Sequence, residues 1–307
     1  MDILQGLYSK SGIVMQKVAE ELLFVEKDER IPKIDELSKK YNAGRGTIQS
    51  VLKKMEESQC IELESRGHLG TFLRKKNVNM LLQYCGVNKI VGVMPLPYSK
   101  KYEGLATALH EEFSNLELPL HIAFMRGAAV RLSNVLEGRY DFALVSKYAA
   151  EEAISKNSEL MILKEFGPSS YVSGHVLMFS EEATEIKDGM KIGIDSFSTD
   201  QQALTLVEAQ GKQVEYVNLN YMHLLQHLKA KSIDAMVWNV DEIDDKSFHV
   251  VPLTTDEAKQ MDQYMSDAVC VINKHNRQIQ YLFNLISCKR ITAVQQQVEC
   301  GERIPKY

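Results

Sequence analysis

Polar side chains that could hold a small ligand follow several expected strands in the second part of the chain. Arg126 comes soon after one apolar run, and hydroxyl groups stand where several helix-like runs begin. In open α/β sheets a ligand lies beyond the carboxyl ends of the strands, where backbone N–H groups and loop side chains converge. Hydroxyls at helix starts together with an arginine favour an anionic ligand with a carboxylate or phosphate group. The candidate ligand-binding residues are Tyr98, Ser99, Arg126, Gly127, Ser146, Ser196, Ser198, Thr199, Trp238 and Asn239.

Each of these residues also has a possible role that needs no ligand. A hydroxyl at a helix start often caps the helix by accepting a backbone N–H. Arg126 could equally pair with a neighbouring acidic residue. Trp238, the only tryptophan, could lie in the core as readily as in the wall of a cleft. The sequence leaves these alternatives open.

Motifs of common enzyme and metal sites are absent from the sequence. We find no phosphate-binding Gly-rich loop, no nucleophile elbow and no His-Glu-x-x-His, so nothing nominates a catalytic nucleophile or a cofactor. His223 and His227 lack a third metal ligand nearby, and the acidic run 241–245 lacks calcium-loop spacing. The five cysteines include no Cys-x-x-Cys pair, which favours a reducing compartment. The sequence therefore predicts no catalytic residue, no metal and no cofactor.

Composition and charge point to more than one domain. The 307 residues are 45% hydrophobic and 25% charged, which is enough for two or three cores. The net charge of −5 argues against a protein that coats nucleic acid over its whole surface. Residues 1–76, however, carry 14 Lys and Arg against 12 Asp and Glu, so the positive balance lies at the front of the chain.

The elements expected in residues 1–76 are three short helices and a hairpin. Apolar residues recur at helical spacing from Ser11 onward, and Pro32 is suited to the first turn of a second helix. A turn at 42–44 precedes a third helix, which gives a helix-turn-helix. Alternating residues from Ile61, a turn at 66–68 and a returning run at 69–73 predict a two-stranded hairpin, called the wing below. Together these elements predict a winged helix.

Alternating strands and helices are expected in residues 89–307. Apolar runs at 89–94, 121–124 and 141–145 form one set with intervening helices, and runs at 191–195, 213–217 and 234–237 form another. This alternation predicts parallel sheets. Because the two sets are joined near residues 167–174, we expect two lobes with a cleft between them.

Three blocks of the first domain resemble a known family. Ile31–Leu37, Gly44–Ile48 and Arg66–Phe72 are similar, in residues and spacing, to the GntR-type winged helix of bacterial repressors. The resemblance implies that Arg45, Gly46 and Thr47 begin the recognition helix and that Gly70 lets the wing approach the DNA backbone. The chain departs from the family at Gln49, where many members carry an arginine, which leaves base specificity open.

The resemblance assigns contacts to particular side chains. Thr47 lies at a helix N-terminus, whose free N–H groups and partial positive charge suit a phosphate oxygen. Side chains on the recognition helix would reach base edges or phosphates in the major groove, and the wing would reach the minor groove or the backbone. Any one of these residues could instead simply be solvated. The candidate DNA-binding residues are Lys33, Arg45, Gly46, Thr47, Gln49, Ser50, Lys53, Arg66 and His68.

The second domain resembles the type II periplasmic-binding-protein fold that serves as a sensor in LysR-type regulators. Arg126-Gly127 and the run Leu136–Ser146 carry this similarity. The combination with a winged helix is similar to the YhfZ-type regulators over nearly the whole chain. The expected fold class is α/β overall, with a winged helix-turn-helix followed by a bilobal α/β domain. The expected domains are 1–76, a linker at 77–88, and 89–307.

These observations predict a DNA-binding transcription regulator that senses a small, anionic effector. Two winged helices on two half-sites would bind more tightly than one, so we expect a homodimer on double-stranded operator DNA. No signal peptide and no run of about 20 apolar residues is present, so a cytoplasmic protein with no membrane partner is expected. An enzyme that uses the same bilobal fold and a module that binds protein through its wing remain alternatives. Effector, operator and sign of regulation are not specified by the sequence.

Overall fold

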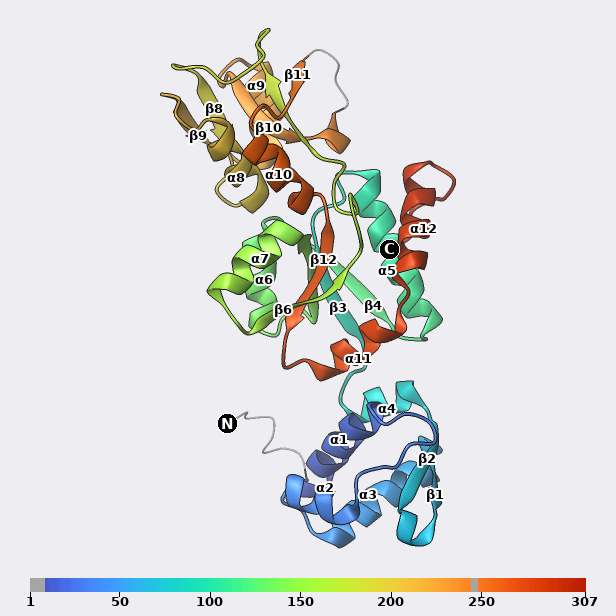
Figure 1. The fold of residues 1–307 in the computed structure, drawn as a ribbon. Coiled ribbons are helices and arrows are strands. Elements are labelled where there is room, and N and C mark those ends of the chain that lie inside the picture. Colours follow the sequence, from blue (N-terminus) through green and yellow to red (C-terminus); the bar gives the residue numbers. More distant parts are fainter. Residues whose placement is uncertain (1–8, 244–247) are drawn as a thin grey trace. The chain divides into compact units, whose positions relative to one another are not determined.

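The computed structural model describes residues 9–243 and 248–307, which form two compact units (Figure 1). The first unit runs to residue 90 and also includes residues 114–119 and 280–285. The second contains residues 91–113, 120–279 and 286–307. Of the acidic run 241–245, Asp244 and Asp245 lie outside the described residues.

The first unit begins with the three expected helices. These are α1 (Lys10–Leu23), α2 (Ile34–Lys40) and α3 (Arg45–Glu57). The helices pack because each buries one apolar stripe; Val18, Leu37 and Ile48 are almost fully buried. The prediction that Pro32 lies in the first turn of α2 is wrong, because the helix begins at Ile34 with Lys33 as its N-cap. The Glu36 carboxylate accepts the Lys33 backbone N–H at 2.9 Å, which satisfies one of the free donors at this helix start.

The wing follows α3 as the sequence predicts. Strands β1 (Ile61–Ser65) and β2 (Thr71–Lys76) pair antiparallel, and a short 3₁₀ turn, Gly67–Leu69, joins them. Arg30 adds an isolated antiparallel bridge to Phe72. Helix-turn-helix and wing together form a winged helix.

Residues 77–88, expected as a linker, include a packed helix. Helix α4 (Val78–Tyr84) contacts α1, and its Leu81 and Leu82 are fully buried. Gln16 of α1 donates through Nε2 to the Cys85 carbonyl oxygen at 2.9 Å. The segment thus carries part of the first unit's core, and the expected domain boundaries remain a prediction.

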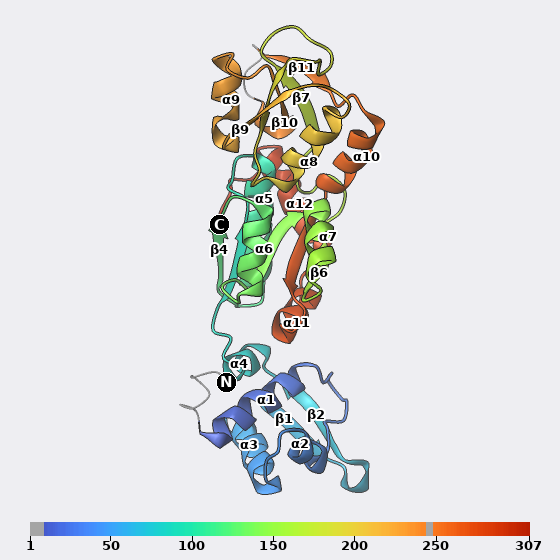
Figure 2. The same ribbon diagram turned by 90° about the vertical axis from the view of Figure 1, so that its left-hand side faces the viewer.

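The second unit contains two five-stranded sheets, one in each lobe. Lobe one has the strand order β4 (Leu120–Phe124), β3 (Ile90–Met94), β5 (Phe142–Ser146), β12 (Ala268–Asn273) and β6 (Leu160–Glu165). Helices α6 (Ala128–Leu136) and α7 (Lys147–Lys156) cover one face of this sheet, and α5 (Lys100–Asn115) and α12 (Cys288–Glu299) cover the other (Figures 1 and 2). Helix α11 (Arg277–Leu285) precedes α12 in the chain.

Lobe two has the order β11 (His249–Pro252), β7 (His175–Phe179), β10 (Ala235–Asn239), β8 (Lys191–Ile194) and β9 (Glu215–Asn218). Its helices are α8 (Thr199–Glu208), α9 (Tyr221–Lys229) and α10 (Asp256–Met265). Two apolar clusters form its core: one includes Leu204 of α8 and the other Leu224 of α9. The fold class expected from the sequence is confirmed.

The expectation of parallel sheets is only partly right. Strand β3 runs parallel to β5, and β8 runs parallel to β9 and β10. Strand β12, however, is antiparallel to β5 and β6, and β7 is antiparallel to β10 and β11. Both antiparallel strands are the first that the chain forms after it crosses between the lobes: β7 on entering lobe two and β12 on returning to lobe one.

The two crossing segments, residues 166–174 and 266–267, lie side by side. Tyr171 donates its backbone N–H to the Ser266 carbonyl at 2.8 Å, and Ser169 donates to the Asp267 carboxylate at 3.0 Å. The two segments are therefore hydrogen-bonded together as one connection between the lobes.

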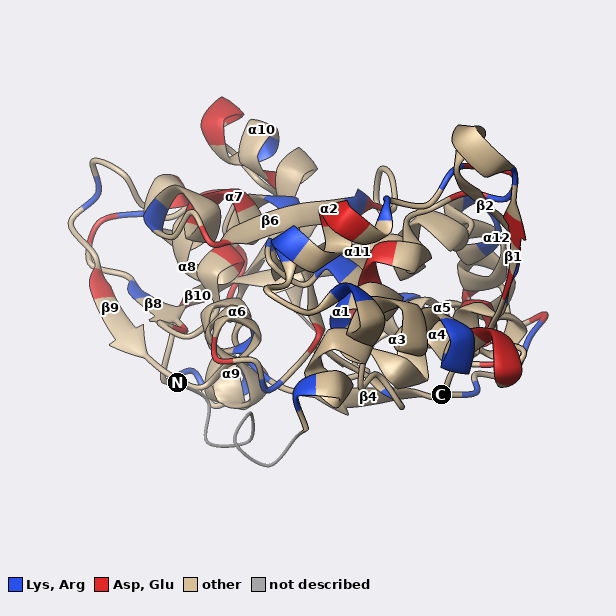
Figure 3. Ribbon diagram, turned by 90° about the horizontal axis from the view of Figure 1, so that it is seen from below, with Lys and Arg blue, Asp and Glu red and all other residues tan. Residues whose placement is uncertain are grey.

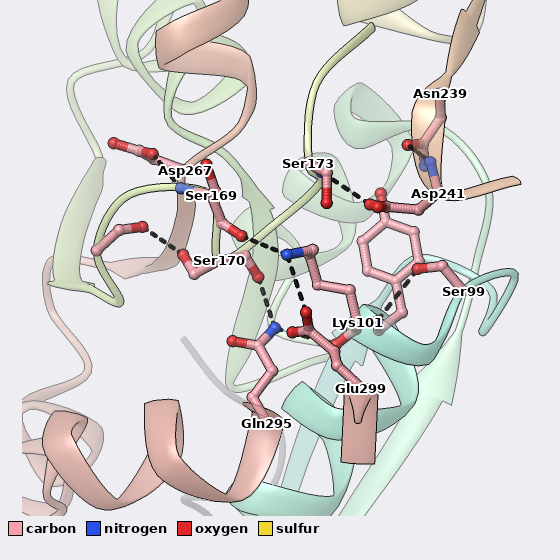
Figure 4. A network of polar contacts seen from close by, with 12 residues as sticks. Ser99, Lys101, Ser169, Ser170, Ser173, Asn239, Asp241, Asp267, Gln295 and Glu299 are labelled. Carbon is pink, nitrogen blue, oxygen red and sulfur yellow. Dashed lines mark hydrogen bonds and ion pairs between the residues drawn. The ribbon is translucent and has the colours of Figure 1, made fainter. Parts of the chain in front are cut away.

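Helices α5 and α12 hold this connection from lobe one (Figure 4). Gln295 donates through Nε2 to the carbonyl oxygens of Lys101 and Ser170, at 3.0 and 2.8 Å. Lys101 Nζ donates to the Ser169 carbonyl at 2.8 Å and forms an ion pair with Glu299 at 3.2 Å. A Cβ on Gly104 would lie 2.9 Å from the Gln295 backbone, so the glycine permits this close helix contact.

Candidate functional site

A cavity of about 100 Å³ lies between the two lobes of the second unit. The loops after β3 and β4 and the start of α6 line it from lobe one, and the start of α8 lines it from lobe two. Six expected ligand-binding residues reach it: Tyr98, Arg126, Gly127, Ser198, Thr199 and Asn239. The strand-end rule thus leads to residues that line this cavity, and their role in ligand binding remains a prediction.

Four expected residues do not line the cavity. Ser99 is buried and accepts the Tyr102 N–H, which makes it a helix cap. Ser196 is exposed and hydrogen-bonds Asn218. Trp238 lies behind Tyr221 in the core of lobe two.

Ser146, the fourth, caps α7 and links the lobes. Its Oγ accepts the Ala149 N–H at 3.1 Å and donates to Asp200 Oδ1 at 2.8 Å. Burial raises the pKa of Asp200 to about 6, and the Ser146 hydrogen bond opposes this rise by stabilising the carboxylate. Ser146 thus contacts the cavity only indirectly, through its hydrogen bond to Asp200 of the opposite lobe.

Arg126 is held by a carboxylate of the protein itself. Its Nη2 lies 2.6 Å from Asp195 Oδ2, and the Asp195 side chain is only 2% exposed. Asp195 also accepts the backbone N–H groups of Phe197 and Tyr221 at 2.9 and 3.0 Å. Because Asp195 directly follows β8 and Arg126 follows β4, the ion pair spans the cleft between the lobes.

A second arginine, Arg131 of α6, was missed from the sequence. It is 3% exposed and donates to the carbonyl oxygens of Leu144 and Met125 and to the Tyr171 hydroxyl. Within residues 9–243 and 248–307, no carboxylate lies within 4.0 Å of its guanidinium nitrogens. Its position in mid-helix matches no motif, so the sequence carries no signal for it.

Glu242 is another missed residue of the cavity wall. Its Oε1 accepts a hydrogen bond from Asn239 Nδ2 at 3.0 Å and another from the Tyr221 hydroxyl at 3.4 Å. Burial raises the pKa of Glu242 to about 7, and these hydrogen bonds partly oppose the rise. At neutral pH the cavity therefore contains a carboxyl group close to its point of half-ionisation.

Aromatic rings form one side of the cavity. Tyr221 stacks on Trp238 with a centroid separation of 4.3 Å and an interplanar angle of 8°. The Tyr98 ring lies 6.3 Å from Tyr221, and its buried hydroxyl has no hydrogen-bond partner in the part of the chain that the structure describes. An unsatisfied buried hydroxyl in a cavity wall is a group that a ligand can satisfy.

In the first unit, the outer face of α3 is exposed. Arg45 is 70% exposed in its side chain, and Thr47 is half-buried near the N-cap Gly44. The remaining expected residues, all exposed, are Lys33, Gly46, Gln49, Ser50, Lys53, Arg66 and His68. Four of the expected residues, Lys33, Arg45, Gln49 and Lys53, line one groove beside the wing.

Several cations of this surface have acidic neighbours. Arg45 Nε lies 2.7 Å from Asp35, and Arg66 lies 3.0 Å from Glu64. Figure 3 shows acidic as well as basic segments on the winged helix. Exposed pairs of this kind are weak and screened by salt, so the arginines can exchange partners readily.

Arg30, which also lines the groove, was not predicted, and it explains Gly70. Gly70 has a φ of 101°, and a Cβ there would lie 2.6 Å from Arg30 Nε. The structural reason for this glycine is thus the left-handed backbone and the packing of the Arg30 side chain. Its expected approach to DNA remains a prediction.

Fold and sites together define a helix-turn-helix protein with a bilobal α/β domain. Comparison with known proteins places it more narrowly. Residues 77–307 match the YhfZ C-terminal domain, and residues 27–73 match a helix-turn-helix domain family. The chain belongs to the YhfZ family.

The relatives agree with this assignment. The YhfZ protein of Escherichia coli strain K12 is 34% identical over 303 residues, covering 97% of this chain and 98% of the relative. The crystal structure of YhfZ from Shigella flexneri has 35% identity and a TM-score of 0.61, over 75% of this chain and 98% of that one. The methionine-binding protein MetQ is more distantly similar, with 12% identity and a TM-score of 0.47 over 72% of this chain and 98% of that one.

Membrane-spanning helices and metal clusters are both absent from the described residues. No described helix is both long and apolar enough to cross a lipid bilayer. The described His, Cys, Asp and Glu side chains form no group of three that could hold a metal ion.

Proposed function

We propose that this protein is a DNA-binding transcription regulator that senses a small ligand in the cleft of its second unit. The helix-turn-helix domain points to a regulator rather than an enzyme. The recognition element would be α3, with the wing and Arg30 beside it, in the GntR-like manner that the sequence predicts.

One observation carries this proposal: the outer face of α3 is open and polar. Arg45, Gln49 and Lys53 are exposed on successive turns, and the glycines Gly44 and Gly46 leave the helix start free of bulky side chains. Such a helix can enter a major groove, with its first N–H groups near a phosphate. In the groove, phosphates would replace Asp35 as the partner of Arg45.

The proposed assembly is a homodimer on two half-sites. A ligand that changes the lobe arrangement would alter the spacing of the two recognition helices, with a coupling of about 1–3 kcal/mol.

Fluorescence anisotropy tests DNA binding by the full chain. The probe is a labelled duplex from upstream of the protein's own gene, titrated between 50 and 300 mM salt (roughly the range in which counterion release is measured). We expect log affinity to fall linearly with log salt, because displaced counterions oppose binding, and a scrambled duplex to bind more weakly. Absence of binding to either duplex at the lowest salt would contradict the proposal.

A further inference from the structure

We propose that the cleft between the lobes binds a small zwitterion, whose cationic group lies against Glu242 and the Tyr98 and Tyr221 rings and whose anionic group lies against Arg131 and Arg126. This inference rests on the proposed ligand-sensing function and specifies the chemistry of the ligand. It differs from the anion that the sequence predicts.

The charges of the cavity wall are the first support. The lining contains two arginines, three carboxyl groups (Asp195, Asp200 and Glu242), and His175, whose Nδ1 lies 2.6 Å from Asp262 Oδ1. Of the arginines and carboxyl groups, only Arg126 and Asp195 form an ion pair within 4.0 Å in the described residues. In residues 9–243 and 248–307, no carboxylate lies within 4.0 Å of the Arg131 guanidinium. In the same residues, no cationic group lies within 4.0 Å of the Asp200 or Glu242 carboxyl group.

Unpaired buried charges are costly, and a ligand can remove that cost. A simple anion would satisfy Arg131 but would add negative charge to a wall that already has more carboxyl groups than arginines. A simple cation would satisfy Glu242 and leave Arg131 unpaired. A molecule with both charges satisfies both sides.

The aromatic groups are the second, independent support. Tyr221 is held in place by stacking on Trp238, and Tyr98 lies 6.3 Å from it, in the same wall as the carboxyl group of Glu242. An alkylammonium group is attracted to aromatic faces as well as to carboxylates. The Tyr98 hydroxyl, unpartnered among the described residues, offers a further hydrogen bond.

The size of the cavity limits the ligand. Its volume of about 100 Å³ is well below the roughly 300–1,000 Å³ of pockets for drug-sized molecules. We therefore infer a compact molecule in which one ammonium group and one carboxylate are separated by a few atoms.

The test uses matched probes on the full chain at pH 7. The probes are the common amino acids and β-alanine, their N-acetyl derivatives, the amines that lack the carboxylate, and succinate and inorganic phosphate as simple anions. We expect at least one zwitterion to raise the melting temperature, and its N-acetyl and amine counterparts to bind at least tenfold more weakly. If no zwitterion binds, or if succinate or phosphate binds as well as the best zwitterion, the inference is overturned.

Two further measurements identify the role of Glu242. Glu242→Gln should weaken zwitterion binding at least tenfold, whereas Glu181→Gln, an exposed glutamate of the same lobe, should change nothing. Calorimetry of the wild type in two buffers reports protons directly. An ammonium group beside Glu242 favours its carboxylate and releases protons, whereas an anion there takes protons up. His175 and Asp241 are the other charged groups that act on Glu242. Because the proposed ammonium group would release protons, proton uptake at pH 7 would contradict the inference.

DNA binding in the same samples separates this inference from the proposed function. If simple anions bind the cleft and zwitterions do not, ligand sensing stands and the inference fails. If zwitterions bind but no duplex does, the inference about the ligand stands and the proposed role as a DNA-binding regulator is contradicted.

Discussion

Arg126 Nη2 lies 2.6 Å from Asp195 Oδ2, and this bond joins the two lobes across the cleft. The arginine expected to receive an anionic ligand is thus already occupied by a carboxylate of the opposite lobe. Asp195 is nearly inaccessible and is held by two backbone N–H groups, so it is a fixed partner rather than a mobile one. An anion must displace it or share the guanidinium.

Asp195→Asn should lower stability and increase the affinity for simple anions. We expect a loss of about 1–3 kcal/mol, because a nearly buried charge pair is broken while the backbone hydrogen bonds are partly kept. Chemical denaturation measures the loss, and succinate titration should show tighter binding as Arg126 is released. The exposed pair of Lys231 and Glu181 provides the control, where Glu181→Gln should leave both measurements unchanged.

Arg126→Ala should abolish the thermal shift caused by a cleft ligand and leave DNA binding intact. The substitution removes a cation of the cavity wall, whereas the proposed DNA contacts lie in the other unit. Melting curves with the best zwitterion and anisotropy with the duplex measure the two effects. A variant that responds to ligand like the wild type would show that the ligand binds elsewhere.

Arg45→Ala should weaken operator binding at least tenfold with little change in melting temperature. Its side chain is 70% exposed and pairs only at the surface with Asp35, so the fold loses little. Arg139→Ala is the matched control, because Arg139 is equally exposed and also pairs with an acidic neighbour, Glu137. An unchanged dissociation constant for Arg45→Ala would refute the assignment of α3.

Two glycines of the winged helix should respond in opposite ways to alanine. Gly70→Ala should destabilise the first unit by about 1–3 kcal/mol, because the backbone is left-handed there and Arg30 occupies the space. Gly46 is helical, and no atom lies within 4 Å of the position that a Cβ would take, so Gly46→Ala should stabilise the fold by about 0.5 kcal/mol. If the helix start approaches DNA closely, Gly46→Ala should still weaken binding. Equal affinity of both proteins for the duplex would argue against that approach.

The contribution of Glu242 to the stability of the protein should fall as pH rises from about 4.5 to about 7. Burial raises the pKa of Glu242 to about 7 in the folded state, so the folded protein binds a proton that the unfolded chain has released. The full difference corresponds to about 3 kcal/mol. Denaturation at several pH values should show this slope in the wild type and a shallower one in Glu242→Gln. Parallel curves for the two proteins would contradict the assignment.

The winged helix was predictable because the sequence signals for its helices and turns lie within short segments of the chain. Each helix carries its apolar stripe within a few turns, and the turn at 42–44 and the wing turn follow directly in the sequence. The antiparallel entry of β12 was not predictable in this way. It depends on where the chain recrosses between the lobes, about a hundred residues after β6.

The cleft was half predictable. Tyr98, Arg126 and Asn239 follow or end strands, and the same rule would have nominated Asp195, which directly follows β8. Arg131 and Glu242 lie within a helix and a short 3₁₀ turn, so no strand-end rule finds them. The two residues come to line one cavity only because the lobes that carry them adjoin it, and a local sequence pattern does not show this.

The late position of β12 also sets an order of folding during synthesis. This strand fills the middle of lobe one's sheet, between β5 and β6, and α12 then fastens the crossing segments. A nascent chain that ends before residue 268 leaves two strand edges open in that lobe, whereas α1–α3 and the wing are complete. The part of the molecule proposed to bind DNA is thus assembled well before the part that would control it.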